Sequence, residues 1–147
     1  MKLFATFLLL SGSIAAVAQS EAYFRAPVAD RAMAGLSAGE ATLVQTGQLN
    51  QLHYQATGRS NIVNLSQQGT ANALDLTITG TNNRYSFAQQ GDNNVARWQS
   101  RQSNAQLDVL QRGDNNQLIQ TGNGRAAGVP LRIEQTGGMQ LQIQTGF

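Results

Sequence analysis

The chain contains no cysteine, a single lysine and a single histidine, and charged residues make up only 12% of its 147 residues. Without cysteine it can form neither disulfides nor a metal–thiolate site, so we expect packing and backbone hydrogen bonds to stabilise it. The nine arginines are scattered singly among eight acidic residues, which argues against a nucleic-acid partner. His53 is predicted at an outward position without repeated partners, so we expect no metal, no cofactor and no enzymatic activity.

Long apolar runs are also missing, apart from a short one near the start of the chain. Lys2 is followed by an apolar run over residues 3–10 and by Ala16 and Ala18, which is the pattern of a signal peptide cleaved after residue 18. This run is too short to span a membrane. We therefore predict that residues 1–18 are a signal peptide and that the mature chain is secreted. Residues 19–40 contain two glycines that weaken a faint helical pattern, and they are predicted to be a flexible leader.

The strongest positive signal is a strict repeat over residues 41–122. A Gln-X-Gly triplet and a following Asn recur at one fixed spacing, and further Gly and Asn residues divide each unit into two equal halves. One half-unit departs from the pattern, with Gln102 and Ala105 in place of Gly and Asn. A fixed period of this kind indicates one structural unit stacked on itself. The recurring residues are Gln45, Gln67, Gln89 and Gln111; Gly47, Gly58, Gly69, Gly80, Gly91 and Gly113; and Asn50, Asn61, Asn72, Asn83, Asn94 and Asn116.

Between these turns, apolar and polar residues alternate with a period of two, which predicts strands with one buried face. The alternation argues against a disordered chain, although the abundance of Gln, Asn, Gly, Ser and Thr would allow one. Tyrosine and tryptophan fall on the inward parity, so core packing is favoured over a stacking platform for a ligand. The inward positions are Leu43, Leu52, Tyr54, Val63, Leu65, Leu74, Leu76, Ile78, Tyr85, Phe87, Trp98, Leu107, Val109 and Leu118.

The half-unit accommodates one strand and one Gly-X-X-Asn turn, because glycine tolerates positive φ and asparagine can bond to its own backbone. We therefore predict an all-β fold, a two-sheet parallel β-solenoid of about five 22-residue strand-turn-strand coils. Equivalent Gln and Asn residues would then form columns in which each buried amide bonds to the next. The first and last coils would leave strand edges unpaired, so we expect self-association end to end.

Two charged turn residues have alternative interpretations. Asp92 and Asp114 lie one repeat apart in identical Gly-Asp-Asn-Asn turns, so the stack would place like charges above each other. They are candidate gatekeepers that slow uncontrolled stacking, or simply good turn residues.

Residues 123–147 are predicted to be a linker followed by irregular C-terminal strands. Pro130 cannot donate to a strand ladder, and the alternation resumes after it on a shortened spacing, off register with the repeats. The resumed alternation places Leu131, Ile133, Leu141 and Ile143 on one parity. One interpretation of this segment is a frayed end of the stack.

The motif Asn-X5-Gln-X-Gly-X-X-Asn, as in Asn61, Gln67, Gly69 and Asn72, resembles the curlin repeat of bacterial curli fibres over roughly residues 40–122. The resemblance implies a subunit of an extracellular functional amyloid that serves adhesion and biofilm matrix as a cell-surface fibre, or fimbrium. It also implies export through the outer-membrane secretion pore dedicated to curli, with its accessory factors, and a leader that this machinery recognises.

Within that family, the chain looks more like the minor subunit, which nucleates polymerisation of the major curlin subunit at the cell surface. The leader after residue 18 is not glycine-rich, and arginines enter the repeats as they do in nucleators. The resemblance makes residues 131–147 the candidate anchor segment. The alternatives are a major curlin fibre subunit or, from another class, a monomeric β-solenoid adhesin with capped ends. The arginines concerned are Arg59, Arg84, Arg97, Arg101 and Arg112.

Overall fold

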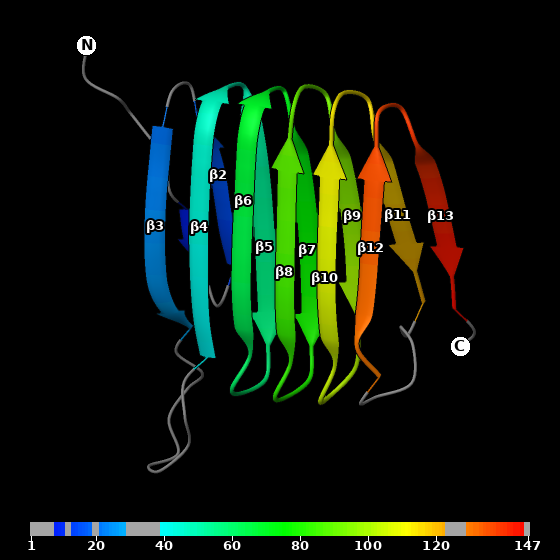
Figure 1. Ribbon diagram of the computed structural model, residues 1–147. Coiled ribbons are helices and arrows are strands. Elements are labelled where there is room, and N and C mark those ends of the chain that lie inside the picture. Colours follow the sequence, from blue (N-terminus) through cyan, green and yellow to red (C-terminus); the bar gives the residue numbers. More distant parts are fainter. Residues whose placement is uncertain (1–7, 11–12, 19–20, 29–38, 123–128, 146–147) are drawn as a thin grey trace.

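The computed structural model describes residues 8–10, 13–18, 21–28, 39–122 and 129–145. These residues form thirteen strands and no helix. The strands make two sheets that face each other, one in the order β1-β2-β5-β7-β9-β11-β13 and the other in the order β12-β10-β8-β6-β4-β3 (Figure 1). Residues 29–38 of the predicted leader and 123–128 of the predicted linker lie outside the described residues.

Four coils repeat at the predicted spacing, and their successive strands in each sheet pair in parallel. The predicted two-sheet parallel β-solenoid is therefore confirmed, although four coils rather than about five keep the 22-residue spacing. The strands are β4 Gly39–Gln48, β5 Asn50–Thr57, β6 Ile62–Thr70, β7 Ala73–Thr79, β8 Arg84–Gln90, β9 Val95–Ser100, β10 Gln106–Arg112 and β11 Gln117–Thr121.

Two further strands, β12 Leu131–Thr136 and β13 Gln140–Gln144, continue the stack at its C-terminal end. Leu107 pairs with Leu131, and Gln117 pairs with Gln140, so both spacings exceed that of the repeat. The prediction that this segment lies off register is wrong. Two additional residues fall in the connection before β12, and the turn before β13 is one residue shorter, so the inward face keeps its register.

The N-terminal end of the stack is covered by antiparallel strands. Strand β2 (Ser13–Ala18) pairs with β5, strand β3 (Glu21–Val28) pairs with β4, and the short β1 (Leu8–Leu10) pairs with β2. The expectation of an unpaired first edge is therefore wrong for β4, because β3 folds back onto N–H and C=O groups that would otherwise lack strand partners, whereas β5 is covered only by β2. Strands β1 and β2 fall in the predicted signal peptide, and β3 falls in the predicted leader.

The tight turns contain two positions with positive φ, only one of which the repeat motif indicated. At the first position, Gly69 has φ of 122°, and a Cβ there would lie 2.1 Å from the carbonyl oxygen of Gly91, so only glycine fits. The second position lies two residues further on and is not reserved for glycine. Its residues, with φ between 55° and 60°, are Leu49, Ser60, Ala71, Asn82, Asn93, Asn104 and Asn115.

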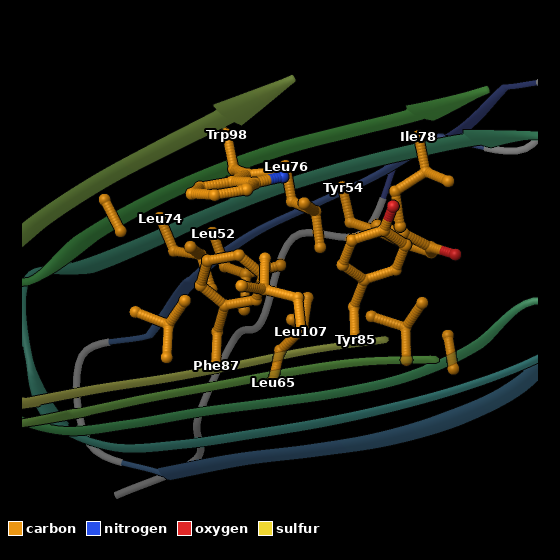
Figure 2. Close-up of a cluster of buried hydrophobic side chains, with 14 of the residues drawn as sticks. Leu52, Tyr54, Leu65, Leu74, Leu76, Ile78, Tyr85, Phe87, Trp98 and Leu107 are labelled. Atoms are coloured by element: carbon orange, nitrogen blue, oxygen red, sulfur yellow. The ribbon is translucent and has the colours of Figure 1, made fainter. Parts of the chain in front are cut away.

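The core lies between the sheets and is continuous along the stack (Figure 2). All the predicted inward positions are buried, so the period-two prediction is confirmed. Phe87 and Trp98 from opposite sheets meet edge to face, with ring centroids 6.2 Å apart at 64°. The hydroxyl of Tyr85 donates a 2.7 Å hydrogen bond to Ser100 Oγ, whereas the buried Tyr54 hydroxyl has no partner among the described residues.

We predict that Leu49→Asn raises the free energy of unfolding by about 1 kcal/mol, because the left-handed conformation is costly for most side chains but tolerated by asparagine. Leu49 has φ of 58° and is 57% exposed, so the substitution removes little buried surface. Urea unfolding of freshly prepared monomer, followed by the fluorescence of Trp98, measures the change. Leu49→Ala is the matched control, because it trims the side chain without relieving the backbone. Equal gains in both variants would contradict this explanation.

Burial raises the pKa of Tyr54 and also that of Tyr85, where the hydrogen bond to Ser100 partly offsets the effect. For each tyrosine the folded pKa lies above the unfolded value of about 10. The stability gained by burying the neutral phenol is therefore complete below about pH 10 and is lost as pH rises further. We predict that Tyr54→Phe lessens the alkaline loss and, by removing an unpartnered hydroxyl, adds about 1 kcal/mol at neutral pH. Unfolding curves at neutral and alkaline pH test both effects.

Tyr85→Phe is the matched control for this prediction. It removes the same atom from the same core but breaks the bond to Ser100. We expect it to lower neutral stability by about 1 kcal/mol. A gain in both variants, or a loss in both, would show that the hydrogen-bonding state of the hydroxyl does not determine the outcome.

Candidate functional site

The candidate functional site is the set of amide columns that runs through the stack, together with the two ends where these columns stop. The four predicted glutamines are buried and form one column. Each Nε2 donates to the Oε1 of the next glutamine toward the C-terminus, at 2.6 Å from Gln45 to Gln67, 2.7 Å from Gln67 to Gln89 and 2.8 Å from Gln89 to Gln111.

The second Nε2 hydrogen of these glutamines is also used. Gln67 donates to the carbonyl of Gln51 at 3.0 Å, and Gln89 donates in the same way to the carbonyl of Ala73 at 3.1 Å. Each such bond joins the two sheets across the interior. The column therefore fixes the position of neighbouring coils along the stack and the position of the two sheets across it.

A fifth glutamine, Gln135, extends the column. Gln111 Nε2 donates to Gln135 Oε1 at 2.7 Å. We did not predict this position because its spacing from Gln111 is longer than the repeat, although the triplet Gln135-Thr136-Gly137 carries the same motif. The column ends here, since Gln135 Nε2 donates to the carbonyls of Gln117 at 2.9 Å and Met139 at 3.2 Å.

The asparagines form two columns that donate in the opposite direction. Asn72 donates from both its backbone N, at 3.0 Å, and Nδ2, at 3.1 Å, to Asn50 Oδ1. Asn94 and Asn116 repeat this pair of bonds in the same column. Asn83 does so with Asn61 in the other column.

Both asparagine columns stop where the sequence changes. Met139 N donates to Asn116 Oδ1 at 3.1 Å, and Ala105 N donates to Asn83 Oδ1 at 2.9 Å. Methionine and alanine supply the backbone donor but no amide oxygen for a further coil. The predicted columns are therefore present, and their ends lie at these two residues.

The predicted turn glycines occupy the positive-φ positions for which the motif selected them. Their φ values lie between 80° and 141°, for Gly47, Gly58, Gly69, Gly80, Gly91 and Gly113.

Asp92 and Asp114 have a bonding role that the sequence did not indicate. Asp92 Oδ1 accepts the backbone N–H of Thr70 at 2.7 Å, and Asp114 Oδ1 accepts that of Asp92 at 2.8 Å. Ser103 Oγ accepts the N–H of Thr81 at 3.0 Å in the equivalent place of the other turns. These side chains therefore join consecutive turns, and their role as gatekeepers stays a prediction.

The outer faces carry exposed pairs of polar side chains. His53 Nδ1 lies 3.1 Å from Asp75 Oδ1, and Arg112 Nη1 lies 3.3 Å from Glu134 Oε1. Exposed pairs of this kind contribute little to stability. Within the described ranges, no three His, Cys, Asp or Glu residues are grouped so that they could hold a metal ion. None of the described segments forms a helix that could cross a membrane.

The candidate anchor residues lie against the stack. Ile133 is buried in the core, Leu131 and Ile143 pack partly against it, and Leu141 is 38% exposed. The apolar side chains of the tail therefore contribute mainly to the packing of the last coil. What β12 and β13 leave available is the outer backbone edge, since they are the terminal strands of their sheets in the described part of the chain.

Comparison with known proteins assigns the chain to no group: no family model, no curated protein and no solved structure matches it. The columns and their ends are therefore the features of the molecule that indicate its function.

We predict that Gln89→Met lowers the free energy of unfolding by about 2–4 kcal/mol, because it leaves Gln67 Nε2 without its acceptor and Gln111 Oε1 without its donor inside the core. Methionine has a similar length, so lost packing contributes little. Urea unfolding measures the effect. Gln90→Met, at the adjacent exposed position, should change stability by less than about 0.5 kcal/mol. Equal losses at both positions would show that the column does not hold the coils together.

Proposed function

We propose that the chain is a structural subunit of an extracellular curli-type functional amyloid, and more specifically the surface-associated minor subunit that nucleates polymerisation of the major curlin subunit. The observation that carries the proposal is the buried column of five glutamine amides, from Gln45 to Gln135, within a parallel stack. Parallel in-register strands with amide columns are the arrangement by which amyloid adds subunits.

The two ends of the stack support a templating role, because the last coil has open edges and the first is covered only by antiparallel strands. The outer edges of β12 and β13 belong to terminal strands, so their N–H and C=O groups lack a strand partner among the described residues. Exposed edges recruit further strands. A nucleus needs such an ordered edge, because it spares the incoming chain the cost of forming the first coil without a template.

The proposal includes a route and a place for the chain. Residues 1–18 direct export, residues 19–40 present the chain to the curli secretion pore and its accessory factors, and the fibre forms outside the cell for adhesion and biofilm matrix. The tail from residue 131 is the proposed anchor segment. Because Leu131 and Ile133 pack against the stack, attachment would use the open end of the last coil, where Leu141 is 38% exposed.

Two other functions remain as alternatives. A major fibre subunit would share the same columns but would polymerise readily alone. A monomeric β-solenoid adhesin would remain a monomer. The irregular spacing of the last coil favours the minor subunit, since it makes one end of the stack different from its interior.

The test is a seeding assay with residues 19–147 added at a small molar fraction to monomeric major curlin, followed by thioflavin T fluorescence. We predict that the lag phase is abolished, because the stack supplies a preformed edge. Gln89→Met should weaken this effect, and Gln90→Met should not.

Each other outcome selects a different function. An unchanged lag, with rapid fibre formation by the chain alone, would indicate a major subunit. A lasting monomer in both assays would exclude an amyloid function and leave the adhesin.

A further inference from the structure

The glutamine column has a direction, and its two ends differ. Each inter-glutamine bond is donated toward the C-terminus. The column therefore leaves the Oε1 acceptor of its first glutamine and the Nε2 donor of its last glutamine without a glutamine partner. At the C-terminal end, the donor Gln135 Nε2 is occupied by the carbonyls of Gln117 and Met139. At the N-terminal end, Gln45 is only 2% exposed, and its Oε1 has no hydrogen-bond partner among the described residues.

The strand that covers this end satisfies the backbone but leaves the amide unmatched. Strand β3 pairs antiparallel with β4, and Ala22 stands opposite Gln45. Alanine has no side-chain donor. A buried carbonyl oxygen without a donor costs about 1–3 kcal/mol, so the cover is an imperfect substitute for another coil.

A parallel coil would remove this defect. Between interior coils, the strand that precedes β8 in its sheet, β6, supplies both a parallel backbone ladder and a glutamine Nε2 for the Oε1 of Gln89. A coil placed before β4 in the same way would donate its glutamine Nε2 to Gln45 Oε1. It would have to take the place that β3 now occupies beside β4, and the place beside β5 that β2, part of the predicted signal peptide, occupies.

We propose that the first coil, β4–β5, is the surface on which this chain receives the C-terminal coil of another curlin-type solenoid, and that β3 is the exchangeable cover of this surface. The inference rests on the proposed nucleating function. It specifies which end of the stack binds the incoming chain, how the two chains are oriented, and that Gln45 is the residue recognised. The incoming chain contributes an inward glutamine whose Nε2 is free at its own C-terminal end.

A second copy of this chain meets that requirement poorly. Its Gln135 Nε2 already donates to two carbonyls, and its asparagine column ends at Met139, which has no side-chain amide. A regular repeat protein that ends in a glutamine and an asparagine at the matched positions fits better. The inferred occupant is therefore the terminal coil of such a regular repeat protein, which under the proposed function is the major curlin subunit.

The first experiment compares Gln45→Met with Gln135→Met in residues 19–147, as seeds for monomeric major curlin. Each variant loses one inter-glutamine bond at one end of the column, and Gln135→Met also loses the two bonds to the carbonyls of Gln117 and Met139. Gln135→Met is therefore the more demanding control, and urea unfolding measures the stability of both variants. We expect Gln45→Met to require about tenfold more seed for the same lag, which corresponds to one lost buried hydrogen bond. Gln135→Met should seed like the unmodified chain. Equal losses, or a greater loss in Gln135→Met, would overturn the inference.

The second experiment locks the cover. Tyr23 and Val44 stand opposite each other on β3 and β4, and the chain has no cysteine, so Tyr23→Cys with Val44→Cys creates a single possible disulfide. The oxidised protein should fail to shorten the lag, and reduction should restore seeding. The two single variants control for the substitutions themselves.

The two proposals fail in different ways. If the unmodified chain does not shorten the lag, the nucleating function fails and the inference fails with it. If the unmodified chain seeds and the oxidised double variant seeds equally well, docking at an uncovered first coil is wrong, while the nucleating function stands.

Discussion

Register between neighbouring coils is the constraint on which this structure depends. The period of a strand is two, so a slip of one residue between coils would turn the apolar face outward and separate every glutamine from its partner. The register holds from Gln45 to Gln135 even though the last spacing is longer than the others. The amide columns and the hydrophobic core therefore favour the same alignment, and the turns carry the variation.

The two kinds of column act on different parts of the coil. Glutamine amides join strands across the interior, as Gln67 does with Gln51, whereas asparagine amides secure the turns by bonding to neighbouring carbonyls such as that of Gly69. The glutamines donate toward the C-terminus and the asparagines toward the N-terminus. Consequently the two ends of the stack present different chemistry, which is why the ends rather than a pocket carry the functional argument.

Sequence reasoning predicted the features that repeat. The strict spacing identified the inward residues and the amide columns, because stacking makes equivalent positions neighbours. It missed Gln135, which lies outside the regular spacing, and the left-handed position occupied by residues as different as Leu49 and Ala71, which share no side-chain signature. It also missed the pairing of β3 with β4, since an antiparallel cover leaves no periodic trace in the sequence.

The close approach of successive turns has a consequence for how such a chain can change in length. Gly69 contacts Gly91 through the same backbone arrangement by which Gly47 contacts Gly69. Each coil touches only its neighbours, so one complete repeat unit can be duplicated or deleted while every remaining junction keeps its form. Insertions of any other size inside a strand would break the alignment. Duplication of whole units during evolution would therefore disturb the structure least. Departures from the repeat would be confined to the outermost units.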